Sequence, residues 1–446
     1  MTNIRWRIIT LLLLAATINY IDRVNLSYAA PALMKEFAIG PAQMGVVLSA
    51  FLWTYFLLQV PMGLALDRFG VRYVYGGAAL LWGLATMATA TATGVVSLTA
   101  WRVLLGVGEA PLAPAGTKVI GIWAADHERG FASAMTVAGV PLGVFIGSPF
   151  IGWLLADFGW PAVFVGTGLI AVLWAIGWMT YYRQPEQHPG ANDAERNYLR
   201  QHSRREALPS HASWRLLLTN RNILGLSLGH AALLFNLYFL LTWLPTYLIE
   251  QHHLTTLRTG LFGSIPWFFG LVGALLGGCL SDRLVQRGWT MMRARKAFLG
   301  LGMILSMASL LSLYTVTVTA TVACLSVAVF GILITNSVVW AANAEVAPTR
   351  QGAQVSAIQN CVGNAAGLLA PILVGVLLQL TGSWMAPMLA AAVIALVGAG
   401  IYTLMLSDDA MLVLPAEEMA GDGARHGDPG RHDMPGLDGD VRTTGQ

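Results

Sequence analysis

Four ionisable side chains interrupt long apolar stretches of this chain, where little water is available to solvate a charge. Two are acids and two are bases: Asp22, Arg23, Arg102 and Glu109. A charged residue at the centre of a bilayer costs roughly 2.5–3.5 kcal/mol on insertion scales, so such residues usually mark an ion or substrate pathway. A guanidinium binds a carboxylate through two parallel hydrogen bonds, and a buried carboxylate can exchange a proton. These residue types predict a pathway through the membrane, where the bases could bind an anion and a coupling ion could reach the acids.

Helical rise places the four charges at two depths. At about 1.5 Å per residue, Asp22 and Arg102 both lie roughly 9 Å below one face of the hydrocarbon layer, and Glu109 lies near the midplane. Asp22 and Arg23 are consecutive, so they point in different directions and pair poorly with each other. We therefore expect Asp22 to pair with Arg102, which leaves Arg23 free to face a central cavity. The alternative is a static network of all four, but such a network adds little stability over apolar packing.

The elements that must position these charges are membrane-spanning helices. Of the 446 residues, 56% are hydrophobic and only 11% are charged. A soluble domain carries about 25% charged residues, so an ordinary soluble enzyme is excluded. A helix needs about 20 apolar residues to cross the hydrocarbon core. We predict twelve such spans, at residues 8–30, 42–66, 73–93, 96–118, 131–154, 160–182, 222–249, 259–280, 297–315, 318–343, 353–378 and 384–406.

One long polar insertion divides the spans into six and six. The segment 63–68 reads GLALDR and the segment 278–283 reads GCLSDR, an offset of 215 residues. Duplicated six-helix halves are typical of secondary transporters whose site lies between the halves. The predicted fold is an all-α membrane protein of two pseudo-symmetric six-helix bundles. Its predicted parts are a first bundle over 1–182, a cytoplasmic loop over 183–221, a second bundle over 222–406 and a disordered cytoplasmic tail over 407–446.

Basic residues predict the orientation of the bundles. Most arginines fall on the side of the N-terminus, whereas the opposite side shows only Lys35 and Arg258. By the positive-inside rule, both termini lie in the cytoplasm and the protein is a multi-pass component of the inner (plasma) membrane. The basic excess reflects this orientation, so the bilayer is an expected partner and nucleic acid is not.

No cofactor, metal or catalytic residues are expected. Cys279, Cys324 and Cys361 lie in apolar stretches without the spacing of metal ligands. The segment 106–109, GVGE, is not a phosphate loop because no basic–hydroxyl dipeptide follows it. The sequence has no Walker motif, so any transport would be secondary.

Three motifs carry a family resemblance. The loop Gly63-x-x-x-Asp67-Arg68-x-Gly70-x-Arg72 resembles the loop signature of the major facilitator superfamily. NYIDRVN at 19–25, together with RVLLGVGEAP at 102–111, is similar to the anion:cation symporter family, which includes bacterial galactonate and glucarate transporters. The resemblance covers roughly residues 5–406. It implies that Asp22 and Glu109 couple protons and that Arg23 binds the substrate carboxylate.

The loop residues have a structural interpretation. Asp67, Arg68 and Arg72 are expected to cap helix ends and to pair across the halves, which would stabilise one gate state. The same interpretation applies to Asp282 and Arg283 in the second half.

Further substrate contacts are expected from both halves. Tyr55 could offer its hydroxyl to a carboxylate or to Asp22, or its ring could lie at a helix interface. The resemblance assigns sugar-acid binding to Ser337, Trp340 and Asn360, and Arg102 is a further candidate. Asn360 and Asn364 are one turn apart and could instead join helices. Where sugar-acid members tend to carry polar residues, this chain reads VAGVP at 137–141 and VV at 338–339, so an aromatic or shorter carboxylate stays open.

The expected function is proton-coupled import of an organic carboxylate by a monomer, with a sugar acid as the first candidate substrate. With both acids ionised, the four central charges sum to zero and attract no anion. Protonation leaves a net positive site, and a bound anion in turn favours the protonated acids. The alternatives are an anion exchanger or facilitator without proton coupling, and a ligand sensor that does not transport.

Overall fold

The computed structural model describes residues 2–202, 214–346 and 352–407, and these residues form helices and connecting turns. Eleven segments of this part are long and apolar enough to cross a membrane. They are α1 (Ile4–Glu36), α2 (Pro41–Phe69), α4 with α5 (Val95–Glu109 and Leu112–Trp123), α6 (Arg129–Phe158), α7 (Trp160–Tyr181), α10 (Arg221–His252), α11 (Thr256–Gln286), α12 with α13 and the 3-10 turn η1 (Met291–Ser306, Ala308–Leu311 and Ser312–Tyr314), α14 (Val318–Val346), α15 (Gly352–Thr381) and α16 (Met385–Leu404).

The remaining predicted span is α3 (Val71–Thr89), a helix of 19 residues that packs against α4 and α7. Two short helices, α8 (Asp193–His202) and α9 (Trp214–Thr219), belong to the predicted central loop. The predicted tail beyond Ser407 lies outside the described residues. Several helices are longer than the predicted spans, because a helix continues into its polar ends where hydropathy gives no signal.

The fourth span is not one continuous helix. α4 ends at Glu109, and α5 begins at Leu112 after Ala110 and Pro111. Proline has no backbone N–H and cannot continue the hydrogen-bond ladder of a helix. The break therefore leaves Glu109 as the last residue of α4, in the interior of the bundle.

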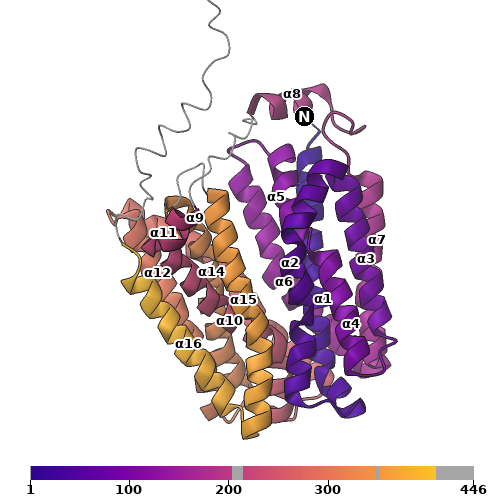
Figure 1. The fold of residues 1–446 in the computed structure, drawn as a ribbon, viewed down its shortest axis with the longest axis vertical. Coiled ribbons are helices and arrows are strands. Elements are labelled where there is room, and N and C mark those ends of the chain that lie inside the picture. Colours follow the sequence, from indigo (N-terminus) through magenta and orange to yellow (C-terminus); the bar gives the residue numbers. More distant parts are fainter. Residues whose placement is uncertain (1, 203–213, 347–351, 408–446) are drawn as a thin grey trace, which may run out of the picture.

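The helices form two groups that lie side by side, α1–α7 and α10–α16 (Figure 1). Each group repeats the same contacts. In the first half, α1 packs on α6, α2 on α4, and α3 on α7; in the second half, α10 packs on α15, α11 on α14, and α12 on α16. The predicted pseudo-symmetry of two six-helix bundles is confirmed.

The halves meet through α2 with α15 and through α6 with α11. These helices approach so closely that backbone touches backbone. A Cβ added at Gly45 would lie 2.4 Å from the carbonyl oxygen of Pro371, and one at Gly375 would lie 2.3 Å from that of Pro41. A Cβ at Gly260 would lie 2.6 Å from a carbonyl oxygen of α6. These close contacts lie at the end of the bundle opposite the N-terminus, and we call them the glycine contacts.

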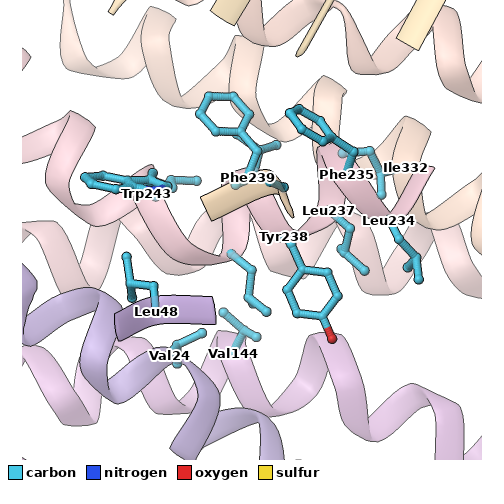
Figure 2. Close-up of a cluster of buried hydrophobic side chains, with 14 of the residues drawn as sticks. Val24, Leu48, Val144, Leu234, Phe235, Leu237, Tyr238, Phe239, Trp243 and Ile332 are labelled. Carbon is cyan, nitrogen blue, oxygen red and sulfur yellow. The ribbon is translucent and has the colours of Figure 1, made fainter. Parts of the chain in front are cut away.

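An apolar layer also joins the halves at the level of α10. Figure 2 shows Tyr238 and Trp243 of α10 above Val24, Leu48 and Val144 of the first half, all in one buried cluster. The Tyr238 side chain points toward the first half, so its hydroxyl is delivered to the interface rather than into its own bundle.

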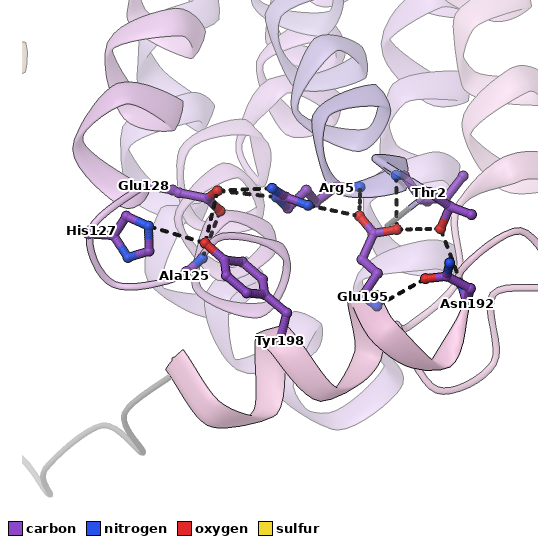
Figure 3. Close-up of polar contacts among 9 residues, drawn as sticks. Thr2, Arg5, Ala125, His127, Glu128, Asn192, Glu195 and Tyr198 are labelled. Atoms are coloured by element: carbon purple, nitrogen blue, oxygen red, sulfur yellow. Dashed lines mark hydrogen bonds and ion pairs between the residues drawn. The ribbon is translucent and has the colours of Figure 1, made fainter.

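On the side of the N-terminus, α8 fastens the start of α1 (Figure 3). Glu195 accepts hydrogen bonds from Thr2 Oγ1 at 2.6 Å and from the backbone N–H groups of Arg5 and Ile4 at 3.1 and 3.2 Å. Arg5 also forms ion pairs with Glu195 and Glu128, at 3.4 and 3.1 Å. Burial acts to raise the pKa of Glu195, but these hydrogen bonds and the Arg5 charge outweigh it and hold the pKa below its ordinary value.

Candidate functional site

Arg23 lies at the interface between the two halves. Its Nε and Nη2 are each 3.1 Å from Oε2 of Glu109, which belongs to the same half. Its Nη1 donates a 3.0 Å hydrogen bond to the hydroxyl of Tyr238 on α10 of the other half. The Arg23 side chain is 5% exposed and Glu109 is fully buried. The prediction left Arg23 free to face a central cavity, and the structure differs because Glu109 and Tyr238 occupy its donors.

Aromatic rings surround the same guanidinium. The Cζ of Arg23 lies 4.8 Å from the ring centroids of Tyr20 and Tyr55 and 5.1 Å from that of Phe51. Rings at this distance attract a cation through their quadrupoles and shield it from water. Tyr55 thus meets Arg23 with its ring, which is closer to the interface interpretation than to the predicted hydroxyl contact with Asp22.

The carboxylate of Asp22 lies among neutral hydrogen-bond donors. Its Oδ2 accepts a 2.5 Å hydrogen bond from Trp82 Nε1, and its Oδ1 accepts a 3.4 Å bond from Asn25 Nδ2. Asn25 Nδ2 also donates to Thr167 Oγ1 at 3.1 Å. Asp22 is fully buried, so these donors replace water around the carboxylate.

Arg102 reaches the level of Asp22 but does not pair with its carboxylate. Its Nη2 donates to Asn25 Oδ1 at 2.6 Å, and its Nη1 donates to the backbone oxygen of Asp22 at 3.4 Å. The predicted Asp22–Arg102 ion pair is wrong, although the backbone contact shows that the two residues lie at one level, as predicted. Rise per residue gives depth but not the direction in which each side chain leaves its helix, and Asn25 lies between the two charges.

One oxygen of Glu109 is unused. Its Oε1 is buried without a hydrogen-bond partner among the described residues, and the same holds for Arg102 Nε. A buried carboxylate oxygen without a donor is costly when ionised and can itself carry a proton. This arrangement suits a group that changes its protonation state.

The residues predicted in the second half contact their own half. Ser337 lies beside α11, where a Cβ added at Gly277 would be 3.2 Å from its Oγ. Trp340 is 38% exposed, and its ring lies edge-on to the His230 ring at 5.7 Å. Asn360 accepts two 2.9 Å hydrogen bonds from the side-chain amide of Asn364, through its backbone and side-chain oxygens. This last contact links two turns of one helix, so it does not join helices.

The loop residues form ion pairs within each half. Asp67 lies 2.6 Å from Lys118, Asp282 lies 2.8 Å from Arg295, and Arg72 Nε donates to a backbone oxygen of α7 at 2.8 Å. Among the described residues the predicted pairing across the halves is not present, because the halves meet at the opposite end of the bundle.

The other two basic loop residues lie near helix ends. Arg68, in the last turn of α2, lies over the ring of Phe69 at 5.2 Å. The backbone oxygen of Arg283 accepts a 3.2 Å hydrogen bond from Arg287 N, which closes the last turn of α11.

Comparison with known proteins decides the family. The family profile of the Major Facilitator Superfamily matches residues 12–371. The chain belongs to this superfamily. It is 32% identical over 417 residues to the D-galactonate transporter of Escherichia coli O6:H1, covering 91% of this chain and 96% of that protein. It is 31% identical over 437 residues to the probable galactarate/D-glucarate transporter GudP of Bacillus subtilis, covering 94% and 96%.

Solved structures show the same fold. A bacterial homologue of the human lysosomal transporter Spinster, in an inward-facing and occupied conformation, superposes with a TM-score of 0.73 at 19% identity and covers 90% of this chain and 96% of that one. The Major Facilitator fold predicted from the sequence is confirmed. The protein is a multi-pass membrane transporter related to sugar-acid transporters, and not an enzyme.

Several residues of this Major Facilitator site were not predicted, and Tyr238, Asn25 and Trp82 form its hydrogen bonds to the central charges. Tyr238 could have been found, because it lies 215 residues after Arg23, the same offset that relates the two loop motifs. Asn25 could also have been found, because it belongs to the NYIDRVN motif. Trp82 gives no signal in the sequence, since a tryptophan in an apolar span is ordinary.

Proposed function

We propose that the protein is a symporter that imports an organic carboxylate together with protons and binds the carboxylate at Arg23. One observation carries the proposal: two donors of Arg23 are given to a single oxygen of Glu109. A substrate carboxylate needs the same fork of donors. Substrate and Glu109 therefore compete for one guanidinium.

Protonation of Glu109 resolves this competition in favour of the substrate. A neutral Glu109 no longer needs Arg23, so two guanidinium donors become available to an anion. A bound anion in turn makes an ionised Glu109 unfavourable and raises its affinity for a proton, since coupling between two sites is reciprocal. Asp22 is the second proposed proton site, and Asn25 joins it to Arg102, the second cation.

The proposed orientation assigns the described conformation to one side of the membrane. If the N-terminus lies in the cytoplasm, the glycine contacts close the outer side of the protein. The described conformation would then be the one that releases substrate and protons into the cell. The rocking of the halves about a central site is the usual mechanism of transporters with this architecture.

A sugar acid is the proposed substrate class. Support comes from relatives named as galactonate and galactarate/D-glucarate transporters. Trp340 is a partly exposed aromatic residue that would stack on a substrate, and Ser337 and Asn360 would supply hydrogen bonds. Because the second half has apolar residues at 338–339, an aromatic or shorter carboxylate is the second candidate class.

The test replaces Glu109 with glutamine in proteoliposomes loaded for uptake of radiolabelled D-galactonate or D-glucarate. Glutamine mimics the protonated state, so we expect counterflow exchange to persist and accumulation driven by an inward proton gradient to disappear. Glu36→Gln is the matched control. Glu36 accepts a 2.6 Å hydrogen bond from Trp160 at the far end of the bundle, and its change should leave both activities intact.

The opposite result would indicate a different transport mechanism. If the Glu109→Gln protein still concentrates substrate under a proton gradient, Glu109 is not the coupling acid, and exchange or facilitated transport becomes the better description. Binding of these acids without any uptake by the unchanged protein would favour a sensor.

A further inference from the structure

A small cavity in the first half, at the end of the bundle that carries the N-terminus (Figure 1), has no part in the proposed transport. It lies between the start of α1, the end of α7 and the segment 182–190 that follows α7, and its volume is about 270 Å³. Arg7, Tyr181, Arg183 and His188 are among the residues that line it. Sites for drug-sized ligands have volumes of roughly 300–1,000 Å³, so this cavity suits a small ion or the headgroup of a larger molecule.

The segment that carries His188 is fixed in place by protein contacts. Arg196 of α8 donates hydrogen bonds to the backbone oxygens of Pro185 and His188, each at 3.1 Å. The backbone N–H of Ala191 donates to the same oxygen of His188 at 3.1 Å. His188 is 3% exposed, and its ring lies edge-on to the Tyr181 ring with centroids 5.1 Å apart. The wall of the cavity is therefore formed without a ligand.

Two hydrogen-bond donors in this wall have no acceptor. The backbone N–H of Gly190 donates to Nδ1 of His188 at 3.1 Å, so the neutral ring carries its proton on Nε2. That Nε2 is buried without a hydrogen-bond partner among the described residues, and the same is true of the Tyr181 hydroxyl. Buried polar groups in proteins nearly always have a partner, so two such donors beside one cavity indicate a ligand with acceptor oxygens.

The charge around the cavity is positive. Arg183 gives Nη1 to backbone oxygens at the end of α7, at 2.8–3.3 Å, and Arg7 is exposed. Neither arginine forms an ion pair within the part of the chain that the structure describes. Burial lowers the pKa of His188, and so do the charges of Arg183, Arg196 and Arg7, whereas Glu195 acts in the opposite direction and is outweighed. At neutral pH the ring is thus an uncharged donor beside two cations.

We propose that this cavity is a binding site for a phosphate group. The phosphate oxygens accept hydrogen bonds from His188 Nε2 and from the Tyr181 hydroxyl, and Arg7 and Arg183 balance the charge. A guanidinium matches phosphate oxygens through parallel hydrogen bonds. The donors come from α1, α7 and the segment 182–190, and a tetrahedral anion offers oxygens in all of these directions, whereas a carboxylate offers two in one plane. The headgroup of an anionic lipid and free phosphate present the same oxygens.

The test gives two probes to the full chain, purified in a neutral detergent. Inorganic phosphate is titrated by calorimetry at constant ionic strength, and retention of phosphatidylglycerol is compared with that of phosphatidylcholine by native mass spectrometry. Binding of inorganic phosphate would identify a site for a soluble phosphate. Preferential retention of phosphatidylglycerol without binding of inorganic phosphate would identify a site for a lipid headgroup. We expect the probe that binds to respond to the variants below.

Two variants remove different parts of the site. Arg7→Gln should weaken binding about fivefold, as for one charge removed beside an anionic ligand at a membrane surface. His188→Phe keeps a ring against Tyr181 and removes the Nε2 donor, and it should weaken binding two- to tenfold. The matched control is Arg200→Gln, which removes an exposed base of α8 at the same end of the bundle that does not line the cavity.

Melting curves show whether each variant is folded, and the exposed position of Arg7 keeps the test valid if His188→Phe unfolds. The control should bind like the unchanged protein. Absence of binding of both probes, unchanged binding by Arg7→Gln, or an equal loss in Arg200→Gln would overturn the proposal. A loss in Arg7→Gln with full binding by a folded His188→Phe protein would indicate attraction to surface charge alone, and would overturn it as well.

Discussion

The two halves of the molecule share one pattern of helix contacts but divide their chemistry unequally. In the centre of the first half, Asp22, Arg23, Arg102 and Glu109 are all at most 5% exposed. The second half buries neutral groups on the helices that face the first half or its own core, among them the amides Asn343, Gln359 and Asn364 and the phenol of Tyr238. Tyr238 stands 215 residues after Arg23 and meets it directly.

This difference bears on how the halves can move past each other. Separating an ion pair in a medium of low dielectric constant costs several kcal/mol. Because all four central charges travel with the first half, a relative movement of the halves separates no ion pair among them. It breaks neutral or singly charged hydrogen bonds instead, such as those from Arg23 to Tyr238 and from Ala42 N to Gln379 Oε1. Because the charges are confined to one half, the free-energy cost of this movement stays low.

The largest expected effect comes from removing the charge that both halves contact. Arg23→Ala should weaken binding of a carboxylate substrate by about 2–5 kcal/mol, the usual cost of losing a desolvated charged pair. That corresponds to roughly 30-fold to several thousand-fold in affinity. Arg23→Lys should recover only part of it, since an ammonium lacks the planar fork. Calorimetric titration with D-galactonate or D-glucarate measures the change, and unaltered affinity in the alanine protein would move the anchor to Arg102.

The next effect tests whether charge in the first half is organised through Asn25. A double-mutant cycle of Asn25→Ala and Arg102→Ala should give a coupling energy of about 1.5–3 kcal/mol, as for a hydrogen bond to a charged group. The cycle of Asp22→Asn and Arg102→Ala should give a smaller coupling, because these side chains do not pair. Melting curves in detergent provide the comparison. A larger coupling for Asp22 would restore the direct ion pair.

A smaller effect is expected at the contact between the halves. Tyr238→Phe removes the hydroxyl that accepts from Arg23, and a net loss of about 0.5–1.5 kcal/mol would shift the two conformers by roughly two- to tenfold. Spin-label distances between α2 and α15 at the glycine contacts report this shift. Tyr247→Phe is the control, because its hydroxyl lies 3.0 Å from Ser312 within the second half. Equal distance distributions for Tyr238→Phe and the unchanged protein would exclude a role in holding the halves together.

The smallest effect belongs to Glu195, which stabilises the first half alone. Its pKa is held below the ordinary value, so its stabilising contribution is complete above the unfolded pKa and is lost as the pH falls through the folded one. The melting temperature of the unchanged protein should therefore decline on acidification below about pH 4.5. Glu195→Gln should be less stable at pH 7, by a few degrees at most, and the gap should narrow toward low pH. A gap independent of pH would mean that charge at Glu195 is irrelevant.

The fold was predictable because a membrane imposes a length and a composition on each helix. Apolar runs gave the spans, and the repeated loop motif gave the division into halves. The break of the fourth span at Pro111 was not predicted. Proline is a signal for such a break, but the hydropathy of the sequence does not change at this position.

The site was predictable in depth but not in partners. Rise per residue put Asp22 and Arg102 at one level, whereas the pairing depended on the direction of each side chain and on the length of Arg102, which reaches Asn25. The partner of Arg23 required knowledge of how the halves face each other. The loop pairs Asp67–Lys118 and Asp282–Arg295 depend on which end of the bundle is closed. The sequence is the same in every conformer, so it does not indicate which pairs form in this one.

The glycine contacts have a consequence for the balance between conformers. At Gly45, Gly375 and Gly260 a glycine meets a backbone carbonyl oxygen. Separating the two helices at these points therefore removes no side chain from a pocket of the other helix and leaves no cavity there. Water can hydrate each carbonyl as it is exposed. The free energies of the closed and open forms can then lie within a few kcal/mol of each other, and a tenfold redistribution needs only about 1.4 kcal/mol. An anion that prefers one form by that amount is enough to set the resting population of the protein.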